Sequence, residues 1–251
     1  MTEWRMAKRE RHYELPWPRR VRTPADAVRF IDHFGLCVLF PLQNVQLPSL
    51  YFALSKRRDA RWDRYAQLIW KWKDELPKRR RAFYAKVLSG RGTFISLKLL
   101  PHFLAMHETA VAPAGHESLY SAGRISHDAH VLWQALAEHG PLPTLELRHA
   151  CKLETQAGNK RFKKAMLELQ GLLIVTHSGI EQETDAWASN RFDLVSRVFP
   201  KQLQQACAIT PDAARLALAT HYRKLYPFAS PVQLARLFGW TKAQAVSALA
   251  L

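Results

Sequence analysis

Apolar residues recur at helical spacing early in the sequence. A stripe of apolar side chains follows Thr23-Pro24 and stops at Gly35: Ala27, Val28, Ile31 and Phe34. Thr is a favoured helix N-cap, Pro is favoured in the first turn, and Gly often ends a helix. The pattern therefore predicts a helix over residues 24–34.

The middle of the sequence predicts three helices in succession. Ser126 caps the first, which runs to about Glu138, and Thr144 caps the second, after a turn at residues 140–143. The third runs from about Asn159 to Gly171 and has an apolar stripe of Phe162, Ala165, Met166 and Leu169. Four cations fall in its first two turns: Lys160, Arg161, Lys163 and Lys164.

A two-stranded ribbon is predicted directly after these helices. Residues 172–177 form the first strand, Ser178-Gly179 is a turn pair, and residues 191–194 form the partner strand. Three helices followed by a ribbon is the order of a winged helix, and a helix that opens with four cations suits the phosphates of a major groove. The alternative is that these cations are only a solvated helix face. The acidic residues of the ribbon are Glu181, Glu183 and Asp185. Phosphate would repel them, so the helix should contact DNA more than the wing does.

The C-terminal residues repeat the helical theme. Thr210-Pro211 opens a helix to about Lys224, Ser230-Pro231 opens a second, and Gly239-Trp240-Thr241 turns into a third. This spacing predicts a helix-turn-helix unit without a wing.

These elements divide the chain into four predicted segments. They are a basic arm at 1–22, a helical module at 23–118, a winged-helix module at 119–205 and a helix-turn-helix unit at 206–251. The predicted fold class is mainly α, with tandem helix-turn-helix and winged-helix modules and a small β-hairpin wing. The lack of extended heptads argues against a coiled-coil dimer and leaves the oligomeric state open.

The charge balance indicates the partner. The 251 residues include 37 Lys and Arg against 21 Asp and Glu, which gives a formal net charge of +16 and a sequence pI near 10.1. Such a balance is typical of proteins that meet polyphosphate, so duplex DNA is the expected partner, with RNA as a weaker alternative. Hydrophobic residues make up 48% of the chain, which excludes a disordered basic tail.

Cysteine usage and hydropathy bear on location. Cys37, Cys151 and Cys207 are far apart and lack zinc-ligand spacing, so they are interpreted as reduced, mostly buried thiols. The sequence has no run of 18 apolar residues and no apolar stretch behind its basic opening, which predicts a cytoplasmic protein without a membrane span.

Cations and aromatic residues are interleaved from Lys56 to Lys86. The aromatic members are Trp62, Tyr65, Trp70, Trp72, Phe83 and Tyr84. Such a mixture suits nucleic acid, although aromatics at helical spacing are more often core residues, and that interpretation is preferred for Trp70 and Phe83. The cations expected to touch phosphate are Lys78, Arg79, Arg80 and Arg81. Arg91-Gly92 is a second place where backbone could approach DNA, although a plain turn explains it equally well.

Three carboxamides lie close together where an apolar stretch enters a turn: Gln43, Asn44 and Gln46. Buried amides cost about 1–3 kcal/mol unless they are hydrogen-bonded, so the group implies a shared network or a ligand site. Simple turn chemistry is the alternative.

An ordered set of short motifs extends this picture: Leu42-Gln43-Asn44-Val45-Gln46-Leu47-Pro48, Ala53-Leu54 with Arg57, Arg91-Gly92-Thr93-Phe94, Gly140-Pro141-Leu142, Phe192-Asp193-Leu194, and Arg197-Val198-Phe199-Pro200. In this order they resemble the AlkZ (YcaQ-type) DNA glycosylases, a family of tandem winged-helix proteins. The resemblance runs from about Thr23 to the C-terminus.

The resemblance implies an activity and a site. Members of that family excise alkylated bases or unhook interstrand crosslinks with a Gln-x-Gln or Gln-x-Asp motif, which falls here on Asn44-Val45-Gln46. Asn44 replaces the first glutamine of the motif, unless Gln43 takes that role. Ile95 stands where many relatives continue Arg-Gly-Thr with Leu-His, so a polar partner is lost. The family usually adds a β-rich C-terminal domain, and this sequence ends at Leu251, so the resemblance implies a short relative.

The chemistry of such a site is limited by its side chains. An N-alkylated purine is already cationic and a good leaving group, so an enzyme need only stabilise an oxocarbenium-like sugar and hold a water molecule. An amide can orient that water but cannot take its proton as a carboxylate would, which predicts activity on labile cationic lesions only.

Neither a metal nor an organic cofactor is expected, because the sequence has no ligand-spaced cluster and no Gly-rich phosphate loop. Four histidines at scattered helical positions are interpreted as structural: His102, His107, His127 and His130. Two functions remain open. One is a monofunctional DNA glycosylase, and the other is a non-catalytic winged-helix DNA-binding protein, either a regulator or a damage binder.

Overall fold

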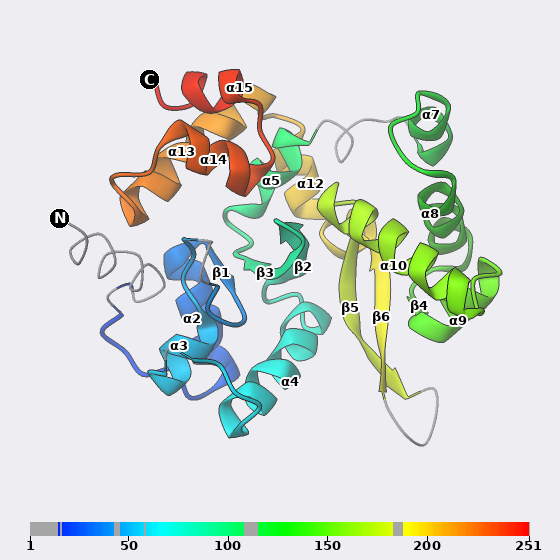
Figure 1. Cartoon of the computed structure of the whole chain (residues 1–251), viewed down its shortest axis with the longest axis horizontal. Coiled ribbons are helices and arrows are strands. Elements are labelled where there is room, and N and C mark those ends of the chain that lie inside the picture. Colours follow the sequence, from blue (N-terminus) through cyan, green and yellow to red (C-terminus); the bar gives the residue numbers. More distant parts are fainter. Residues whose placement is uncertain are drawn as a thin grey trace.

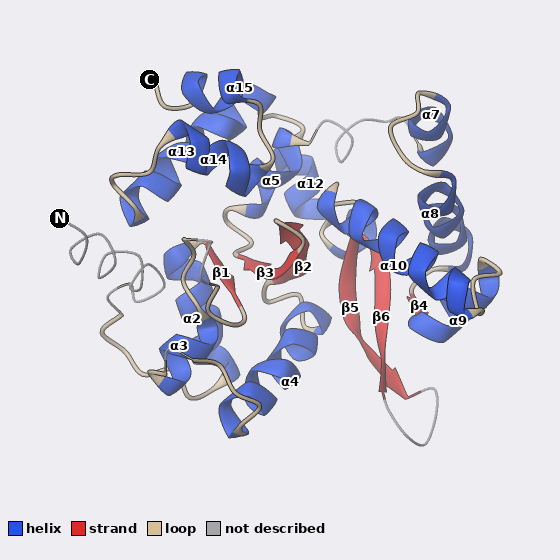
Figure 2. Cartoon of the chain, in the orientation of Figure 1, coloured by secondary structure: helices blue, strands red, loops and turns tan. Residues whose placement is uncertain are grey.

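The computed structural model describes residues 15, 17–42, 46–57, 59–107, 115–182 and 188–250. Most of these residues are helical, and the strands form two small antiparallel sheets of three strands each (Figures 1 and 2). The mainly α fold class predicted from the sequence is confirmed.

The first half of the chain forms one helix-and-sheet unit. Its order is α2 (Pro24–Phe34), β1 (Leu36–Val38), α3 (Leu50–Ser55), α4 (Arg64–Lys78), β2 (Phe83–Leu88) and β3 (Arg91–Ile95), and the sheet order is β1-β3-β2. Thr23 and Asp26 form a capping box at α2, and Gly35 ends the helix, as the sequence predicts. The hairpin β2–β3 was not predicted, and it turns at Ser89 and Gly90, which both have positive φ.

A second unit repeats this order. It contains α7 (His116–Ser121), α8 (His127–His139), β4 (Leu142–Pro143), α9 (Thr144–Ala150), α10 (Gln156–Gly171), β5 (Val175–Gln182) and β6 (Ala188–Leu194). Its sheet order is β4-β6-β5. In both units a short first strand pairs with the last strand of a hairpin, and the longest helix of the unit precedes that hairpin. The chain therefore contains the same arrangement of helices and strands twice.

Several predicted details of the second unit were wrong. Helix α10 starts at Gln156, before Asn159, because Thr155 caps it. Thr144 does not cap α9, since its hydroxyl donates to the carbonyl of Asn190 at 2.9 Å. Strand β5 begins at Val175, because residues 172–173 form a turn in which Leu173 has a φ of 58°. Ser178-Gly179 is a bulge inside β5, where the register with β6 shifts.

The two units cross where their sheets meet. Helix α4 packs on β5, helix α10 packs on β2, and β2 lies against β5. The backbone N–H of Lys86 in β2 donates to Oε1 of Gln170 in α10 at 2.9 Å, and the hydroxyl of Thr176 in β5 donates to the carbonyl of Tyr84 in β2 at 3.0 Å. Each unit thus supplies a helix that packs on the first hairpin strand of the other.

A buried lysine crosses this contact. Lys73 of α4 is paired with Asp74, and its Nζ also donates to Oδ1 of Asn190 in β6 at 3.1 Å. Its side chain is only 3% exposed, so Lys73 does not belong to the surface cations that the sequence pattern groups with it. Burial lowers the pKa of Lys73 and raises the pKa of Asp74, while their mutual attraction opposes both shifts. Removing one partner of such a pair costs about 3–5 kcal/mol, because the other charge stays buried.

Helix α5 (Leu100–Met106), which follows β3, and the C-terminal helices extend the core of the first unit. The C-terminal helices are α11 (Val195–Val198), α12 (Pro200–Ala206), α13 (Pro211–Leu225), α14 (Pro231–Phe238) and α15 (Lys242–Ser247). Thr210, Ser230 and Thr241 cap the last three helices, and Gly239 ends α14 in the left-handed region, as the sequence predicts.

The first sheet is consequently buried on both faces. Leu36 and Val38 of β1 face the core shared with α13 and α14, whereas Cys37 between them faces the core with α2 and α4. Cys37 and Cys151 are buried, Cys207 is exposed, and all three are free thiols. None of the described helices combines the length and apolar character that a membrane span requires.

His177 in β5 predicts acid sensitivity. Its ring is fully buried against Tyr84 and Phe192, and burial, with Lys73 and Lys86 nearby, holds its pKa well below the usual value. Unfolded histidine titrates near pH 6.5, so below that pH the unfolded chain binds a proton that folded His177 does not. The free energy of unfolding should therefore fall on acidification, with His177 contributing about 1.4 kcal/mol per pH unit.

Urea unfolding at pH 7.5, 6 and 5 measures this slope. His177→Phe keeps an aromatic ring in place and should flatten the slope relative to wild type, whereas the exposed His139→Gln should not. An unchanged slope in His177→Phe would show that His177 takes up a proton in the folded state.

Candidate nucleic-acid interface

The chain leaves β1 after Val38 and lies beside it again at Pro48 and Ser49. The Val38 N–H donates to the carbonyl of Pro48, and the Tyr51 N–H donates to that of Leu39, both at 2.9 Å. The Ser49 hydroxyl also donates to the Leu39 carbonyl at 3.3 Å. We call the described residues 39–42 and 46–49 the amide loop, and these hydrogen bonds join its two ends. Gln43 and Asn44 lie outside the described residues.

Gln46, the third carboxamide, is held by the C-terminal helices. Tyr222 of α13 donates its hydroxyl to the Gln46 carbonyl at 2.9 Å, and Nε2 of Gln233 in α14 donates to Oε1 of Gln46 at 3.3 Å. Burial raises the pKa of Tyr222, which keeps the hydroxyl protonated as a donor. Gln46 itself is half-buried.

The oxygen and the nitrogen of the Gln233 side-chain amide make different contacts. Its Oε1 accepts the Ser230 N–H at 2.8 Å in the capping box of α14, which leaves Nε2 to face Gln46. Sequence reasoning missed Gln233, although Ser-x-x-Gln at the start of a helix is a capping-box signal. Nothing in the sequence pattern indicated Tyr222. The partners of Gln46 therefore lie far along the chain, with Tyr222 176 positions and Gln233 187 positions after it.

The cations predicted on the third helix of the second unit lie on one exposed face of α10. Lys160, Lys163 and Lys164 are exposed, and no ion pair to them occurs within the described part of the chain. Arg161 is also exposed, but its Nε donates to Asp128 of α8 at 2.9 Å. The hydrogen bond from Arg161 outweighs burial and lowers the pKa of Asp128. Three of the four cations are therefore available to a ligand, and Arg161 is partly committed to α8.

Lys78 to Arg81 form the end of α4 and the turn after it. All four are exposed, but Lys78, Arg79 and Arg81 lie beside three different elements or residues. The stem of Lys78 lies over Gly179 of β5, and Arg79 pairs with Glu75 at 3.0 Å. Burial raises the pKa of Asp32 on α2, and Arg81 partly offsets this, so Arg81 lies on the side of α2. The four cations share a turn without sharing one face.

Arg91 opens β3 and is exposed, whereas Gly92 serves the internal packing of the sheet. A Cβ at Gly92 would lie 2.3 Å from the Tyr84 hydroxyl oxygen, so no side chain fits there. The need for glycine at position 92 is therefore explained by the close approach of Tyr84, and the turn lies two residues before Arg91-Gly92, at Ser89-Gly90. Gly90 in turn faces Leu167 of α10, with the nearest Leu167 methyl 3.5 Å from its Cβ position.

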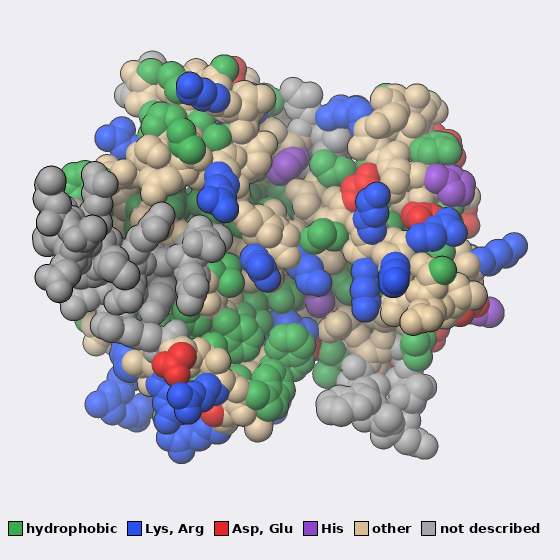
Figure 3. All heavy atoms as spheres, viewed as in Figure 1, with side chains coloured by type: hydrophobic (Ala, Val, Ile, Leu, Met, Phe, Trp, Pro, Cys, Tyr) green, Lys and Arg blue, Asp and Glu red, His purple; other side chains and the backbone are tan. Residues whose placement is uncertain are grey.

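The amide loop, the first sheet and α10 are neighbours in that order. The amide loop leaves β1, the sheet runs β1-β3-β2, and α10 packs on β2. Figure 3 shows Lys and Arg side chains gathered across the middle of the face, over β3, β2 and α10. The exposed cations of those three elements are Lys86, Arg91, Lys160, Arg161, Lys163 and Lys164. We call this set the central cationic surface.

An exposed aromatic pair lies at the edge of the first unit. Trp62 is 66% exposed and Trp70 is 47% exposed, and their ring centroids are 5.8 Å apart. The expectation that Trp70 is a core residue was wrong, because Trp72 and Ile69 fill the inner face of α4 instead. The same expectation for Phe83 is confirmed, since that side chain is fully buried.

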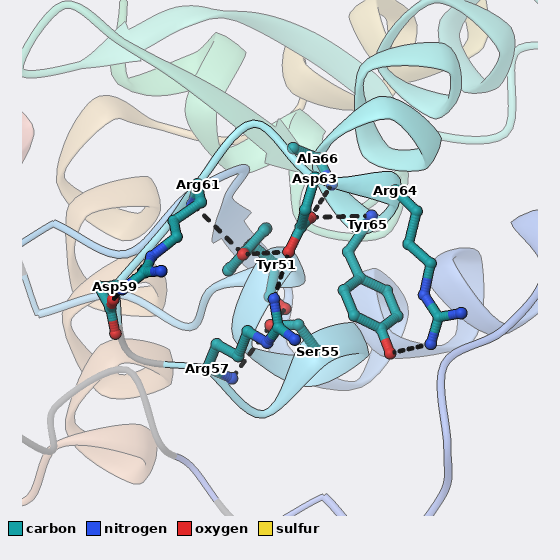
Figure 4. Close-up of polar contacts among 9 residues, drawn as sticks. All are labelled: Tyr51, Ser55, Arg57, Asp59, Arg61, Asp63, Arg64, Tyr65 and Ala66. Carbon is teal, nitrogen blue, oxygen red and sulfur yellow. Dashed lines mark hydrogen bonds and ion pairs between the residues drawn. The ribbon is translucent and has the colours of Figure 1, made fainter.

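The chain beside this pair is ordered by Asp63, the N-cap of α4 (Figure 4). Its carboxylate accepts from the Tyr51 hydroxyl and from Arg57, both at 2.9 Å. Burial alone would raise the pKa of Asp63, but hydrogen bonds from the Ala66 N–H and Tyr51 lower it below its usual value. Arg57, Arg61 and Arg64 surround this network: Arg57 pairs with Asp63, Arg61 pairs with Asp59, and Arg64 donates to the Tyr65 hydroxyl (Figure 4). Trp62 lies between Arg61 and Asp63 in the chain.

Comparison with known proteins adds three findings. The family model described as AlkZ related matches residues 21–239 of the chain. No curated protein matches the sequence. Among solved structures, the DNA glycosylase AlkZ of Streptomyces sahachiroi is similar, with a TM-score of 0.51, 14% sequence identity, and coverage of 98% of this chain and 62% of that one. The chain thus spans less than two thirds of the length of that structure.

Proposed function

The chain belongs to the AlkZ-related family, and on that premise we propose that it binds duplex DNA through the central cationic surface. The observation that carries the proposal is that one small sheet, in the order β1-β3-β2, joins the amide loop at β1 to the cations of β2, β3 and α10. Phosphate contacts supply most of the affinity of such interfaces, and Lys and Arg provide them.

We assign both helix-and-sheet units to the winged-helix class. The order helix, strand, helix, helix, hairpin occurs in each, and α4 and α10 take the position of the helix that enters the major groove. The exposed lysines of α10 suit that role. Helix α4 presents Trp70 and the neighbouring Trp62 instead, and exposed indole rings beside arginines suit stacking on bases or wedging into a groove.

The proposed chemistry is excision of an N-alkylated purine or the unhooking of a crosslink, with Asn44 and Gln46, or Gln43 in place of Asn44, orienting the water. Gln46 supports this in one respect. The Gln233 amide donates to its Oε1, and an amide oxygen has a second lone pair, so the Gln46 carbonyl can still accept a hydrogen bond from the attacking water. Since no amide removes a proton from water, the substrate must carry its own good leaving group, which restricts the activity to cationic lesions.

The second candidate is a DNA-binding protein without glycosylase activity. The contact between Gln46 and Gln233 favours it, because an amide engaged in bracing a loop has less freedom to hold a water. The central cationic surface serves both candidates equally.

Salt dependence should report the phosphate contacts. If about five phosphates are neutralised, log affinity for a duplex falls with log salt at a slope of about −4 to −5. Replacing Lys160 and Lys163 by alanine should make that slope shallower by about 2, because each lysine releases roughly one counterion. Fluorescence anisotropy with a labelled duplex at a series of salt concentrations measures both values.

Two control variants sharpen this test. Lys201→Ala removes an exposed cation from α12, outside the central cationic surface, and should leave the slope unchanged. Trp62→Ala should weaken binding by about 1–3 kcal/mol if a base stacks on the ring, also with no change in slope. A flat salt response of the wild type would remove nucleic acid as the partner.

Release of a damaged base separates the two candidates. Under single-turnover conditions, a duplex with one N7-alkylguanine should acquire an abasic site that alkaline treatment cleaves. Gln46→Ala should slow this release by roughly 10²-fold, the cost of misplacing a reacting group. Asn44→Ala and Gln43→Ala, run beside it, show which residue shares the role.

Gln233→Ala is the matched control for the fold of the loop. It removes the brace on Gln46 and keeps the amide itself, so release should be slowed less than in Gln46→Ala. Tight, salt-dependent binding by the wild type without base release would assign the chain to the non-catalytic candidate.

A further inference from the structure

Two histidines and a glutamate meet on the outer side of the second unit. His116 and Glu117 belong to α7 and His130 belongs to α8, and their ligand atoms all lie within 4.8 Å of one another. The two Nδ1 atoms are 3.2 Å apart. Glu117 Oε1 is 3.8 Å from Nδ1 of His116 and 3.6 Å from Nε2 of His130. No second group of three His, Cys, Asp or Glu side chains approaches this closely within the described ranges.

The aromatic neighbours hold both imidazole rings in place. Tyr120 stacks on His130 with centroids 4.6 Å apart and planes 14° apart, and Trp133 lies 5.8 Å from the ring of His116. Glu117 is 72% exposed, so solvent reaches the point between the three side chains. The two nitrogen ligands are thus preorganised, and the carboxylate can adjust its position.

The spacing fits a transition-metal ion. Two nitrogen ligands of a tetrahedral zinc ion, with bonds of about 2.0–2.1 Å, lie roughly 3.3 Å apart. Two imidazoles with one carboxylate are a known ligand set for zinc that leaves a fourth position open to water. A hydrogen bond between the two Nδ1 atoms explains their distance as well, but it gives no role to the carboxylate, which lies within 4 Å of His116 Nδ1 and of His130 Nε2. One ion would take Nδ1 of both rings, and the exposed Glu117 would turn toward it from Nε2 of His130.

We propose that His116, Glu117 and His130 bind a divalent transition-metal ion, with Zn²⁺ the best match to the ligand types. This changes the interpretation of His130 as a purely structural residue. It also replaces the expectation that the chain binds no metal, which rested on ligand spacing along the sequence. His116 and His130 are 14 positions apart, which hides the group from any local motif.

The ion would stabilise the attachment of α7. That helix has six residues, a single buried side chain, Leu119, and no side-chain hydrogen bond at its N-cap Gly115. Isolated helices of this length are marginal in water, so a bond from α7 to α8 would hold α7 in place.

Zinc titration of the whole chelator-treated protein tests the proposal. Calorimetry should detect one tight equivalent, and Zn²⁺ should raise the melting temperature. His116→Ala and Glu117→Ala should each weaken Zn²⁺ binding at least tenfold and abolish the thermal shift, and Glu117 is exposed, so its variant should fold like wild type. Co²⁺ should give the visible d–d bands of a four-coordinate site in wild type only. Binding should weaken on acidification, because imidazole must lose its proton to ligate.

His149→Ala is the matched control. It removes another His beside a carboxylate, with Nδ1 2.6 Å from Glu154, where no described residue completes a group of three ligands, and the variant should bind Zn²⁺ like wild type. Equal Zn²⁺ affinity in wild type and His116→Ala would overturn the proposal and leave a histidine–histidine hydrogen bond. DNA does not enter the experiment, so the result is independent of the proposed function.

Discussion

Strands β2 and β5 are edge strands of their sheets, and they lie against each other where the two units cross. An edge strand presents unpaired backbone groups, and burying them without partners costs about 1–3 kcal/mol each. Here the partners come from the other unit, since Gln170 accepts the Lys86 N–H and Thr176 donates to the Tyr84 carbonyl. Sliding one unit along the other would break both hydrogen bonds and also separate Lys73 from Asn190. The crossing therefore has one register, and the positions of the functional elements follow from it.

The crossing sets α10 beside the hairpin β2–β3, which joins the cations of two units into one surface. One face of the same sheet packs on α13 and α14, and these helices reach the amide loop through Tyr222 and Gln233. One small sheet thus links the cationic surface at its β2 edge to the braced amide loop at its β1 edge. Under the proposed function, this arrangement would hold a duplex and the Gln46 amide in a fixed relation.

The sequence predicts the elements with strong local signals and misses those that depend on distant partners. The caps at Thr23, Ser126, Thr210 and Ser230 all form as predicted, because capping is decided within four residues. Strands β1, β2 and β3 were missed, because a sheet buried on both faces shows no polar alternation. Trp70 was wrongly predicted as a core residue for a related reason. Helix α4 carries tryptophans on two faces, and helical spacing alone does not say which face packs against the core.

The candidate site also has features that the sequence predicted and features that it missed. The exposure of the α10 lysines was predictable from the helix pattern, and so was the presence of an amide group after the first helix. Tyr222, the burial of Lys73 and the meeting of His116 with His130 were not, because each depends on contacts between elements that the sequence does not order in space. The position of Gln43 and Asn44 stays a prediction.

Lysine footprinting tests the central claim most directly, namely that both units contribute to one DNA-binding surface. The protein is acetylated with and without a duplex, and the modified lysines are identified by mass spectrometry. We expect DNA to protect Lys86 on β2 together with Lys160, Lys163 and Lys164 on α10, while Lys201 on α12 and Lys242 on α15 react equally in both samples. Protection confined to one unit, or centred on Lys201 and Lys242, would contradict the account.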